Sequence, residues 1–496
     1  MSETKNRWNS SLVFILAIIG CAVGLGNIWR YPYILYTNGG GVFFIAYIIA
    51  TLVLGIPFLI LETGMGYNFS SSFPKTSNYI DRKYQLLGWI MPLTEYLLMT
   101  YYMVLIGWNV IYFALSFFKS WGADPSTYFT STLVEHSFTV PNVASFIPIL
   151  VMVVAITWFF LWFVSHRNLE SGVGRISKIF VPLLFLTTCA IVAYTLTLPG
   201  ASIGLNGLFT VDWSRFSDFH IWMAAFGQVI FSLSIGSAAM FTYSCYVDGD
   251  TDIISNSFII VIANGLFENF SAIGVFSVLG YMSLEMGIPL NNLVQEGTSL
   301  AFIIYPTVFN ILGDIGFILG PLFFFSVCIA GFTSALSMIE PLSFSIQNKF
   351  ALTRSKTTLL LCLVGFIASL MYSTTHGLDL LGNVDIFLND IVILIGIVFE
   401  CILFAWVFKA DSLIALLNKN SKYLKVGRIW LFTIRYLLPV IISIVWLGGM
   451  YKIFTSSSVN LVFVIIAGFA IMIAISLAFT LLPPKSEDWE KIDTRI

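Results

Sequence analysis

Twelve apolar stretches, each long enough to cross a lipid bilayer, constrain this chain more than any other feature of its sequence. About 20 apolar residues span the hydrocarbon core as a helix, and no soluble domain interrupts the series. The stretches are 12–36, 42–66, 88–117, 145–165, 176–198, 221–246, 253–283, 316–347, 357–373, 386–408, 430–452 and 459–482. We therefore expect an all-α polytopic membrane protein with about twelve transmembrane helices.

The charge content agrees with a membrane protein and excludes other classes. Only 10% of the 496 residues are charged, against about 25% in a soluble domain. The 24 basic and 26 acidic residues are nearly balanced, which gives no sign of a nucleic-acid partner. All six cysteines fall in apolar stretches without paired spacing, so we expect neither a disulfide framework nor a cysteine metal site. The sequence leaves the oligomeric state open.

The basic residues between the stretches predict the orientation in the bilayer. If the N-terminus is cytoplasmic, 20 Lys and Arg residues face the cytoplasm and three, Lys119, Arg215 and Lys452, face outward. Cytoplasmic loops carry the excess of Lys and Arg, so both tails, 1–11 and 483–496, are expected in the cytoplasm. The outer loop 119–145 has no Cys and no glycosylation acceptor, which favours a prokaryotic plasma (inner) membrane. Residues 294–305 are expected to form a short outer helical lid, and 411–425 a surface helix.

The first stretch contains residues that a simple membrane anchor would not carry. Residues 20–31 read Gly-Cys-Ala-Val-Gly-Leu-Gly-Asn-Ile-Trp-Arg-Tyr, followed by Pro32. Each Gly lowers helix stability by about 1 kcal/mol, and a charge at membrane depth costs about 2.5–3.5 kcal/mol. We interpret the run as a broken helix, whose free carbonyls can bind a cation and whose free amides can bind an anion. The alternative is close helix packing through Gly20 and Gly24.

The sixth stretch carries a second interruption. Residues 228–237 read Gln-Val-Ile-Phe-Ser-Leu-Ser-Ile-Gly-Ser, which places three serines and a glycine at mid-membrane. The first and sixth stretches lie five helices apart and therefore cross in opposite directions. Paired interruptions of this kind indicate an inverted-repeat transporter with a site at the midplane. We expect repeats of five helices at 12–198 and 221–408, with two extra helices at 430–482.

Hydroxyl and amide side chains near these breaks could bind a cation. A desolvated Na⁺ requires hard oxygen ligands, which Ser232, Asn264, Thr333 and Ser334 supply in the sixth, seventh and eighth stretches. The alternative for each hydroxyl is a hydrogen bond to a carbonyl one turn earlier in its own helix. Four polar positions near two broken helices favour a cation site.

Six motifs, spread over essentially the whole chain, form a pattern typical of one family. They are Ala22-Val-Gly-Leu-Gly-Asn-Ile-Trp-Arg-Tyr-Pro32, Asn38-Gly-Gly-Gly41, Tyr101-Tyr102, Gln228 to Ser237, Phe276-Ser-Val-Leu-Gly280 and Ala330 to Ser334. With them, the chain resembles the neurotransmitter:sodium symporter family, and most closely its prokaryotic amino-acid transporters. This resemblance implies sodium-coupled symport of an amino acid, with no enzymatic activity.

The resemblance also implies two sodium sites and a substrate site between the first, third, sixth and eighth helices. The first sodium site would use Ala22, Asn27, Ser232, Asn264 and the substrate carboxylate. The second would use Gly20, Val23, Ala330, Thr333 and Ser334. The substrate would contact Ala22, Leu25, Gly26, Leu98, Tyr102, Phe231, Ser232, Ser234, Ser237, Ser334 and Met338, with its carboxylate on the Tyr102 hydroxyl.

The resemblance further implies an outer gate above the substrate. Arg30 and Asp385 match the gate pair, and Gln228 is expected to steady Arg30. Asp379 offers a rival register for the acidic partner. We prefer Asp385, because Glu400 then falls at the family's spacing further along the helix.

On the cytoplasmic side, Lys5 and Trp8 occupy the positions of the inner gate. The family's acidic partner on the eighth helix falls at Asn348. We therefore expect the inner ion pair of the family to be missing from this chain.

Glu268 lies one helical turn after Asn264, on the same face of the seventh helix. Chloride-dependent members of the family carry Ser at the matching position, and an anion occupies the space beside their first sodium site. The resemblance implies that the Glu268 carboxylate supplies this negative charge, so that no chloride is required. The alternative is a protonated, structural carboxyl group.

The side-chain pocket would be walled by Leu98, Phe231, Ser237, Ser334 and Met338. Ser237 stands where relatives commonly carry Phe or Met, so a large apolar or aromatic amino acid is the expected substrate. Three other functions remain open at this point: a channel, an intramembrane enzyme, and a sodium-linked sensor. The enzyme is disfavoured because no nucleophile–base pair is recognisable.

Overall fold

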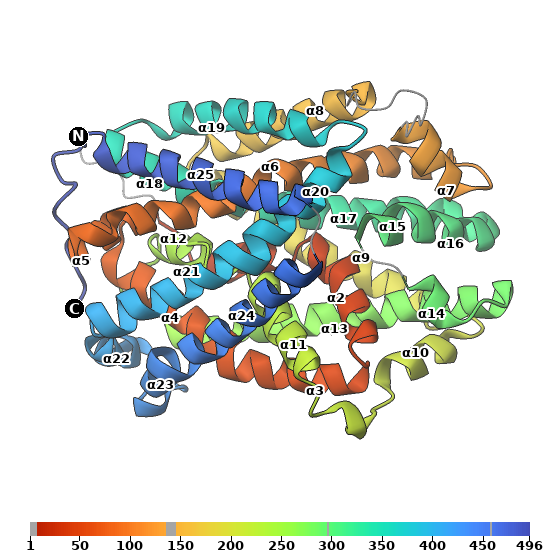
Figure 1. Cartoon of the computed structure of the whole chain (residues 1–496), viewed down its shortest axis with the longest axis horizontal. Coiled ribbons are helices and arrows are strands. Elements are labelled where there is room, and N and C mark those ends of the chain that lie inside the picture. Colours follow the sequence, from red (N-terminus) through yellow and green to blue (C-terminus); the bar gives the residue numbers. More distant parts are fainter. Residues whose placement is uncertain (1–6, 135–144, 295–296, 457–458) are drawn as a thin grey trace.

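The computed structural model describes residues 7–134, 145–294, 297–456 and 459–496 as a bundle of long helices that run roughly side by side (Figure 1). The helices of the bundle are α1 (Ser11–Ala22), α2 (Leu25–Thr37), α3 (Gly41–Ala50), α4 (Ile56–Phe69), α6 (Gln85–Ser116), α8 (Pro148–Ser165), α9 (Arg175–Thr195), α11 (Phe219–Ser232), α12 (Ala239–Ser244), α13 (Ile253–Met286), α17 (Gly316–Met338), α18 (Glu340–Phe350), α19 (Arg354–Ser369), α20 (Gly377–Asp385), α21 (Ile393–Glu400), α24 (Leu438–Ser456) and α25 (Val459–Leu481). The described ranges contain no β-strand beyond two isolated bridges, Gly40–Val211 and Phe146–Thr374.

The described helices supply ten or eleven apolar membrane spans, close to the twelve that the sequence predicts. Ten helices of the described residues are long and apolar enough to cross a bilayer. The pair α1 and α2, bent by 54° at its break, makes a further crossing. The sixth predicted stretch corresponds to α11 and α12, which are individually too short to span. The predicted fold class, a polytopic all-α protein with two broken helices, is confirmed.

The break in the first crossing is short and extended. Val23, with φ −81° and ψ 95°, ends α1, and Gly24, with φ −122° and ψ −163°, precedes α2. The prediction of a broken helix is therefore confirmed. Close packing, the alternative, also occurs at Gly20, where an added Cβ would lie 3.2 Å from Thr333 Cβ and 3.1 Å from Val181.

The break in the sixth crossing is longer. Residues 233–238 separate α11 from α12, and three of them have positive φ: Ser234 at 48°, Gly236 at 79° and Ala238 at 65°. A positive φ is unfavourable for residues other than glycine. The surrounding packing must therefore hold Ser234 and Ala238 in place.

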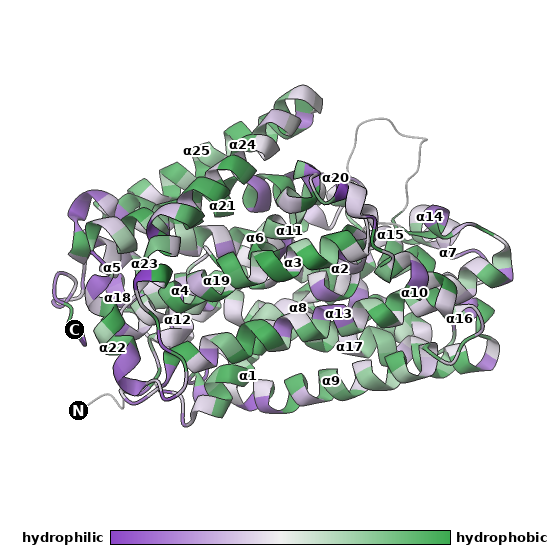
Figure 2. Ribbon diagram, turned by 90° about the horizontal axis from the view of Figure 1, so that it is seen from below, coloured by the Kyte–Doolittle hydropathy of each residue, from purple (hydrophilic) through white to green (hydrophobic). Residues whose placement is uncertain are grey.

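The innermost helices and the outermost ones differ sharply in burial. In the span Arg82–Ser116, which contains α6, 78% of an 18-residue apolar segment is buried inside the protein. In α25 the corresponding share is 17%. Apolar side chains of α25 therefore face lipid, whereas those of α6 form the interior. Figure 2 shows apolar residues along the helices and hydrophilic residues gathered at the end that holds the C-terminus.

Residues near both ends of the chain reach the same end of the bundle, beside the segment that follows α12 (Figure 1). The Trp8 amide donates to the Tyr246 carbonyl (3.0 Å), and the Arg495 guanidinium donates to the neighbouring Val247 carbonyl (2.8 Å). The short helices at this end are α5 (Phe73–Ile80), α22 (Asp411–Asn420) and α23 (Arg428–Phe432).

The opposite end carries the remaining short helices (Figure 1). They are α7 (Pro125–Thr127), α10 (Ala201–Phe209), α14 (Leu290–Leu293), α15 (Gly297–Ser299) and α16 (Tyr305–Ile311). The predicted lid at 294–305 is helical from Gly297 and continues to Ile311; residues 295–296 lie outside the described ranges. The predicted surface helix at 411–425 corresponds to α22.

Candidate functional site

The first group of predicted sodium ligands meets where α2, α11 and α13 come together. Asn27 Oδ1 accepts a hydrogen bond from the Gly24 amide (2.8 Å), and Asn27 Nδ2 donates to Asn264 Oδ1 (2.9 Å). Asn264 in turn donates to the Ser232 hydroxyl. All three side chains are buried, and their oxygens are the hard donors that suit Na⁺.

The second group lies between α1 and α17. The Ser334 hydroxyl points across to α1, within 3.1 Å of the Cys21 carbonyl, 3.3 Å of Gly20 O and 3.4 Å of Val23 O. The Thr333 hydroxyl instead donates within its own helix, to Ala330 O at 3.0 Å and Ile329 O at 3.1 Å. The alternative of local hydrogen bonding thus describes Thr333 but not Ser334. Of the predicted carbonyl ligands, those of Gly20 and Val23 lie beside the Ser334 hydroxyl, and that of Ala330 lies beside the Thr333 hydroxyl.

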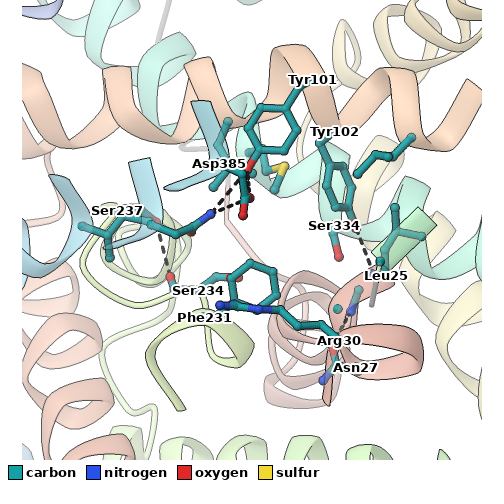
Figure 3. A pocket seen from close by; sticks show the side chains of 18 of the residues that line it. Leu25, Asn27, Arg30, Tyr101, Tyr102, Phe231, Ser234, Ser237, Ser334 and Asp385 are labelled. Carbon is teal, nitrogen blue, oxygen red and sulfur yellow. Dashed lines mark hydrogen bonds between the residues drawn. The ribbon is translucent and has the colours of Figure 1, made fainter. Parts of the chain in front are cut away.

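A cavity of about 380 Å³ adjoins both groups, through Asn27 and Ser334, and is lined by residues of α1, α2, α6, α11, α17 and α20. Ten of the eleven predicted substrate residues line it: Ala22, Leu25, Gly26, Leu98, Tyr102, Phe231, Ser234, Ser237, Ser334 and Met338. Ser232 is the exception, because its side chain lies beside the cavity, bound to Asn264. Figure 3 shows the cavity with its labelled side chains.

One wall of the cavity is unwound backbone at the start of α2. The Leu25 amide donates to the Tyr102 hydroxyl at 3.2 Å, so the two groups that the resemblance assigns to a substrate carboxylate are adjacent. Glycine is required on both sides of Leu25. A Cβ on Gly24 would lie 2.8 Å from Ser334 Oγ, and one on Gly26 would lie 2.2 Å from the Phe231 ring.

The charged gate residues face this cavity without forming an ion pair. Arg30 lies over the Phe231 ring, with its guanidinium carbon 4.0 Å from the ring centroid, and both Arg30 and Asp385 line the cavity (Figure 3). Asp385 Oδ1 accepts hydrogen bonds from the Tyr101 hydroxyl (2.6 Å) and Asn389 Nδ2 (2.8 Å). Asp379, the rival acid, is exposed. This geometry favours Asp385.

Gln228 has a different partner from the one expected. Its Nε2 donates to Glu268 Oε1 at 2.9 Å, and its own Oε1 has no hydrogen-bond partner among the described residues. No bond joins it to Arg30, so Gln228 holds Glu268 and not the gate arginine. The Tyr47 hydroxyl donates to the other oxygen of Glu268, and this carboxyl group is fully buried.

The closure at the end of the bundle that holds Trp8 also differs from the expected one. Trp8 is buried, and its indole donates to the Tyr243 carbonyl at 2.9 Å. Beside it, Arg7 pairs with Asp248 at 2.9 Å, which joins the N-terminal segment to the end of α12. Lys5 lies outside the described residues.

Asn348 accepts hydrogen bonds from the Ser72 amide (3.2 Å) and the Ser71 hydroxyl (3.4 Å). It therefore holds the turn that follows α4. A buried ion pair nearby was missed by sequence reasoning: Glu340 accepts two hydrogen bonds from Arg354, at 2.6 and 2.7 Å, and a third from Tyr246 at 3.0 Å. The sequence feature that could have predicted this pair is Glu340 itself, an acidic residue inside the apolar stretch 316–347.

Glu95 is the second residue that the sequence analysis missed. It lines the cavity and is 2% exposed. Its signal was the spacing along α6: Glu95, Leu98 and Tyr102 share one helix face.

Comparisons with known proteins agree with this architecture. The model of the Sodium:neurotransmitter symporter family matches residues 5–145 and 124–485. The uncharacterized sodium-dependent transporter MJ1319 of Methanocaldococcus jannaschii is 33% identical over 453 residues, which cover 91% of this chain and 92% of that protein. The sodium- and chloride-dependent GABA transporter 2 of Mus musculus is 26% identical over 448 residues, covering 82% of this chain and 73% of the relative.

Among solved structures, MhsT in complex with L-phenylalanine has the same fold. Its TM-score is 0.77 at 25% identity, and the match covers 90% of this chain and 99% of MhsT. The family consists of sodium-dependent membrane transporters and not of enzymes. This chain belongs to the sodium:neurotransmitter symporter family.

Proposed function

We propose that this protein imports an amino acid with a large apolar or aromatic side chain by sodium-coupled symport, without a requirement for chloride. The observation that carries the proposal is the shared wall between the cavity and the two oxygen groups. Ala22, Leu25 and Ser334 line the cavity, while their neighbours Asn27 and Gly20 belong to the oxygen groups. A substrate and two cations bound there would all contact the broken first crossing.

This shared element supports coupling by alternating access. A ligand shifts a conformational equilibrium only by its different affinity for the two states. Binding of substrate and Na⁺ from the outside would close Arg30 and Phe231 over the cavity. Loss of the cation at Ser334 would then free α1 to swing open to the cytoplasm. The excess of basic residues in the inner loops supports a cytoplasmic location of both termini in a prokaryotic plasma membrane.

Uptake into proteoliposomes tests this function. An inward sodium gradient should drive accumulation of the amino acid, and dissipating the gradient should abolish it. A channel would let the amino acid cross without a fixed ratio to the sodium ions. A sensor would bind the amino acid without transporting it. Either result would contradict the proposal.

The walls of the cavity support a large substrate. Leu98, Phe231 and Met338 are apolar, and Ser237 leaves space beside them. Because an unfilled apolar cavity costs about 24 cal/mol per Å³, small amino acids should bind weakly. In a competition assay, Leu, Phe, Tyr and Trp should inhibit sodium-driven uptake at lower concentrations than Gly and Ala. The reverse order would overturn this substrate class. MhsT, whose structure holds L-phenylalanine, offers a positive control.

The outer gate gives a test with a matched control. Asp385→Asn should lower the initial rate of uptake about tenfold, because hydrogen bonds to charged groups contribute about 1.5–3 kcal/mol and the neutral side chain can no longer pair with Arg30. Asp379→Asn, an identical change on the exposed face of the same helix, should leave the rate unchanged. Equal effects of the two substitutions on the uptake rate would show that Asp385 has no specific role in the gate.

A further inference from the structure

Besides the gate residue Asp385, one more acidic side chain among the described residues lines the cavity. This is Glu95, which is 2% exposed and lies in the middle of α6. Neither the two oxygen groups nor the gate contains it. A buried carboxyl group requires hydrogen-bond partners, because its removal from water is otherwise strongly unfavourable.

The position of Glu95 places it at one end of the cavity. Glu95, Leu98 and Tyr102 follow each other at spacings of three and four residues, so all three lie on the same face of α6. Seven residues of helix advance about 10 Å from Glu95 to Tyr102. Tyr102 meets the Leu25 amide at the end assigned to the substrate carboxylate. Glu95 therefore lies toward the opposite end, where a long side chain of the substrate would terminate.

The surroundings of Glu95 are short of hydrogen-bond donors. The Ser237 hydroxyl lies beside its carboxyl group but donates to the Ser234 carbonyl at 3.3 Å. None of the ion pairs between described residues includes Glu95. Another acidic side chain, Glu62, lies near enough to influence Glu95, and its Oε2 already accepts the Gly236 amide at 3.4 Å. The protein thus supplies acceptors at this end of the cavity, and the ligand must supply the donor.

We propose that Glu95, together with Ser237, recognises the far end of the substrate side chain, and that the transported amino acid carries an N–H or O–H donor there. This rests on the proposed function, within which it selects an aromatic amino acid with a phenol or an indole over a purely apolar one. A site built to hydrogen-bond a substrate rejects the analogue that lacks the donor, because its own buried polar group is then left unpaired.

The experiment compares amino acids that differ in this donor alone. The purified protein is titrated in Na⁺ with tyrosine and phenylalanine, and with tryptophan and 1-methyltryptophan, and binding is followed by ligand-induced thermal stabilisation. The wild type should bind the donor-bearing member of each pair about tenfold or more tightly. Glu95→Leu should abolish or reverse this preference, and Glu95→Gln, which keeps a carbonyl acceptor, should retain part of it. Glu285→Gln, on the exposed end of α13, serves as the control.

The outcomes separate this inference from the proposed function. Equal binding of both members of each pair by the wild type, or an unchanged preference in Glu95→Leu, would overturn the role of Glu95. A lysine and norleucine pair is included in the titrations. Binding of lysine in preference to norleucine, with no response to the four aromatic compounds, would overturn the proposed substrate class while supporting Glu95 as the acceptor. No binding by any of the six compounds would overturn both.

Discussion

Replacing Glu268 by serine is expected to make sodium-driven uptake depend on chloride, while wild-type uptake continues unchanged when gluconate replaces chloride. Glu268 is fully buried one turn from Asn264, and its side chain faces Ser232. At about 5 Å and an effective dielectric of about 20, a carboxylate and Na⁺ attract by roughly 3 kcal/mol. In chloride-free medium, the sodium concentration for half-maximal uptake should therefore be about 100-fold higher in the serine variant than in the wild type.

A second substitution separates charge from structure at this position. Glu268→Gln keeps acceptor and donor groups near Tyr47 and Gln228, which both donate to the wild-type carboxyl group, but it removes the negative charge. We expect it to lose sodium affinity as Glu268→Ser does. If the glutamine variant transports normally without chloride, Glu268 is a structural group. Chloride-dependent wild-type uptake, or a serine variant that chloride does not rescue, would also contradict the proposed role.

Replacing Asn27 by alanine is expected to abolish sodium-driven uptake at sodium concentrations that are half-saturating for the wild type. Asn27 accepts from Gly24, which holds the break in the first crossing, and donates to Asn264, which holds α13 beside it. Each buried polar group left without its partner costs about 1–3 kcal/mol. Loss of the amide oxygen as a ligand adds to this, so the sodium concentration for half-maximal uptake should rise by at least about 100-fold.

Asn38 provides the matched control at the other end of the same helix. Its side-chain amide donates to the Ile34 carbonyl at 2.9 Å, and it is partly exposed. Asn38→Ala should leave sodium dependence within about twofold of the wild type, because substitutions at exposed positions usually change stability by less than about 0.5 kcal/mol. Both variants are compared at equal amounts of folded protein. Normal sodium dependence in Asn27→Ala would remove this residue from the cation site.

Most of the membrane spans and the position of the first break follow from the sequence alone. The length of apolar runs predicts membrane helices because lipid offers no partner for backbone groups, and this rule acts on local composition. Gly24 and the two glycines around it likewise predict a local loss of helix, and the structure breaks there. The sixth crossing was recognised for the same reason, through Ser234 and Gly236.

The chemical types in the site were also predictable, but their partners were not. Amide and hydroxyl groups deep in apolar stretches indicated Asn27, Asn264 and Ser232 as members of a polar site, because such groups require hydrogen bonds in lipid. The sequence analysis assigned Gln228 to Arg30, whereas it binds Glu268. The choice lay between two groups on different helices, and no spacing within one helix distinguishes them.

Tertiary structure alone decided the Arg7–Asp248 and Arg354–Glu340 pairs and the place of Glu95 in the cavity wall. Arg7 and Asp248, for example, are 241 residues apart. The physical reason is that hydrophobic periodicity reports which face of a helix is buried, while the identity of the opposing side chain depends on how helices distant in sequence rotate and pack. Local composition therefore determined the spans and their breaks, and the packing of those spans determined the chemistry of the site.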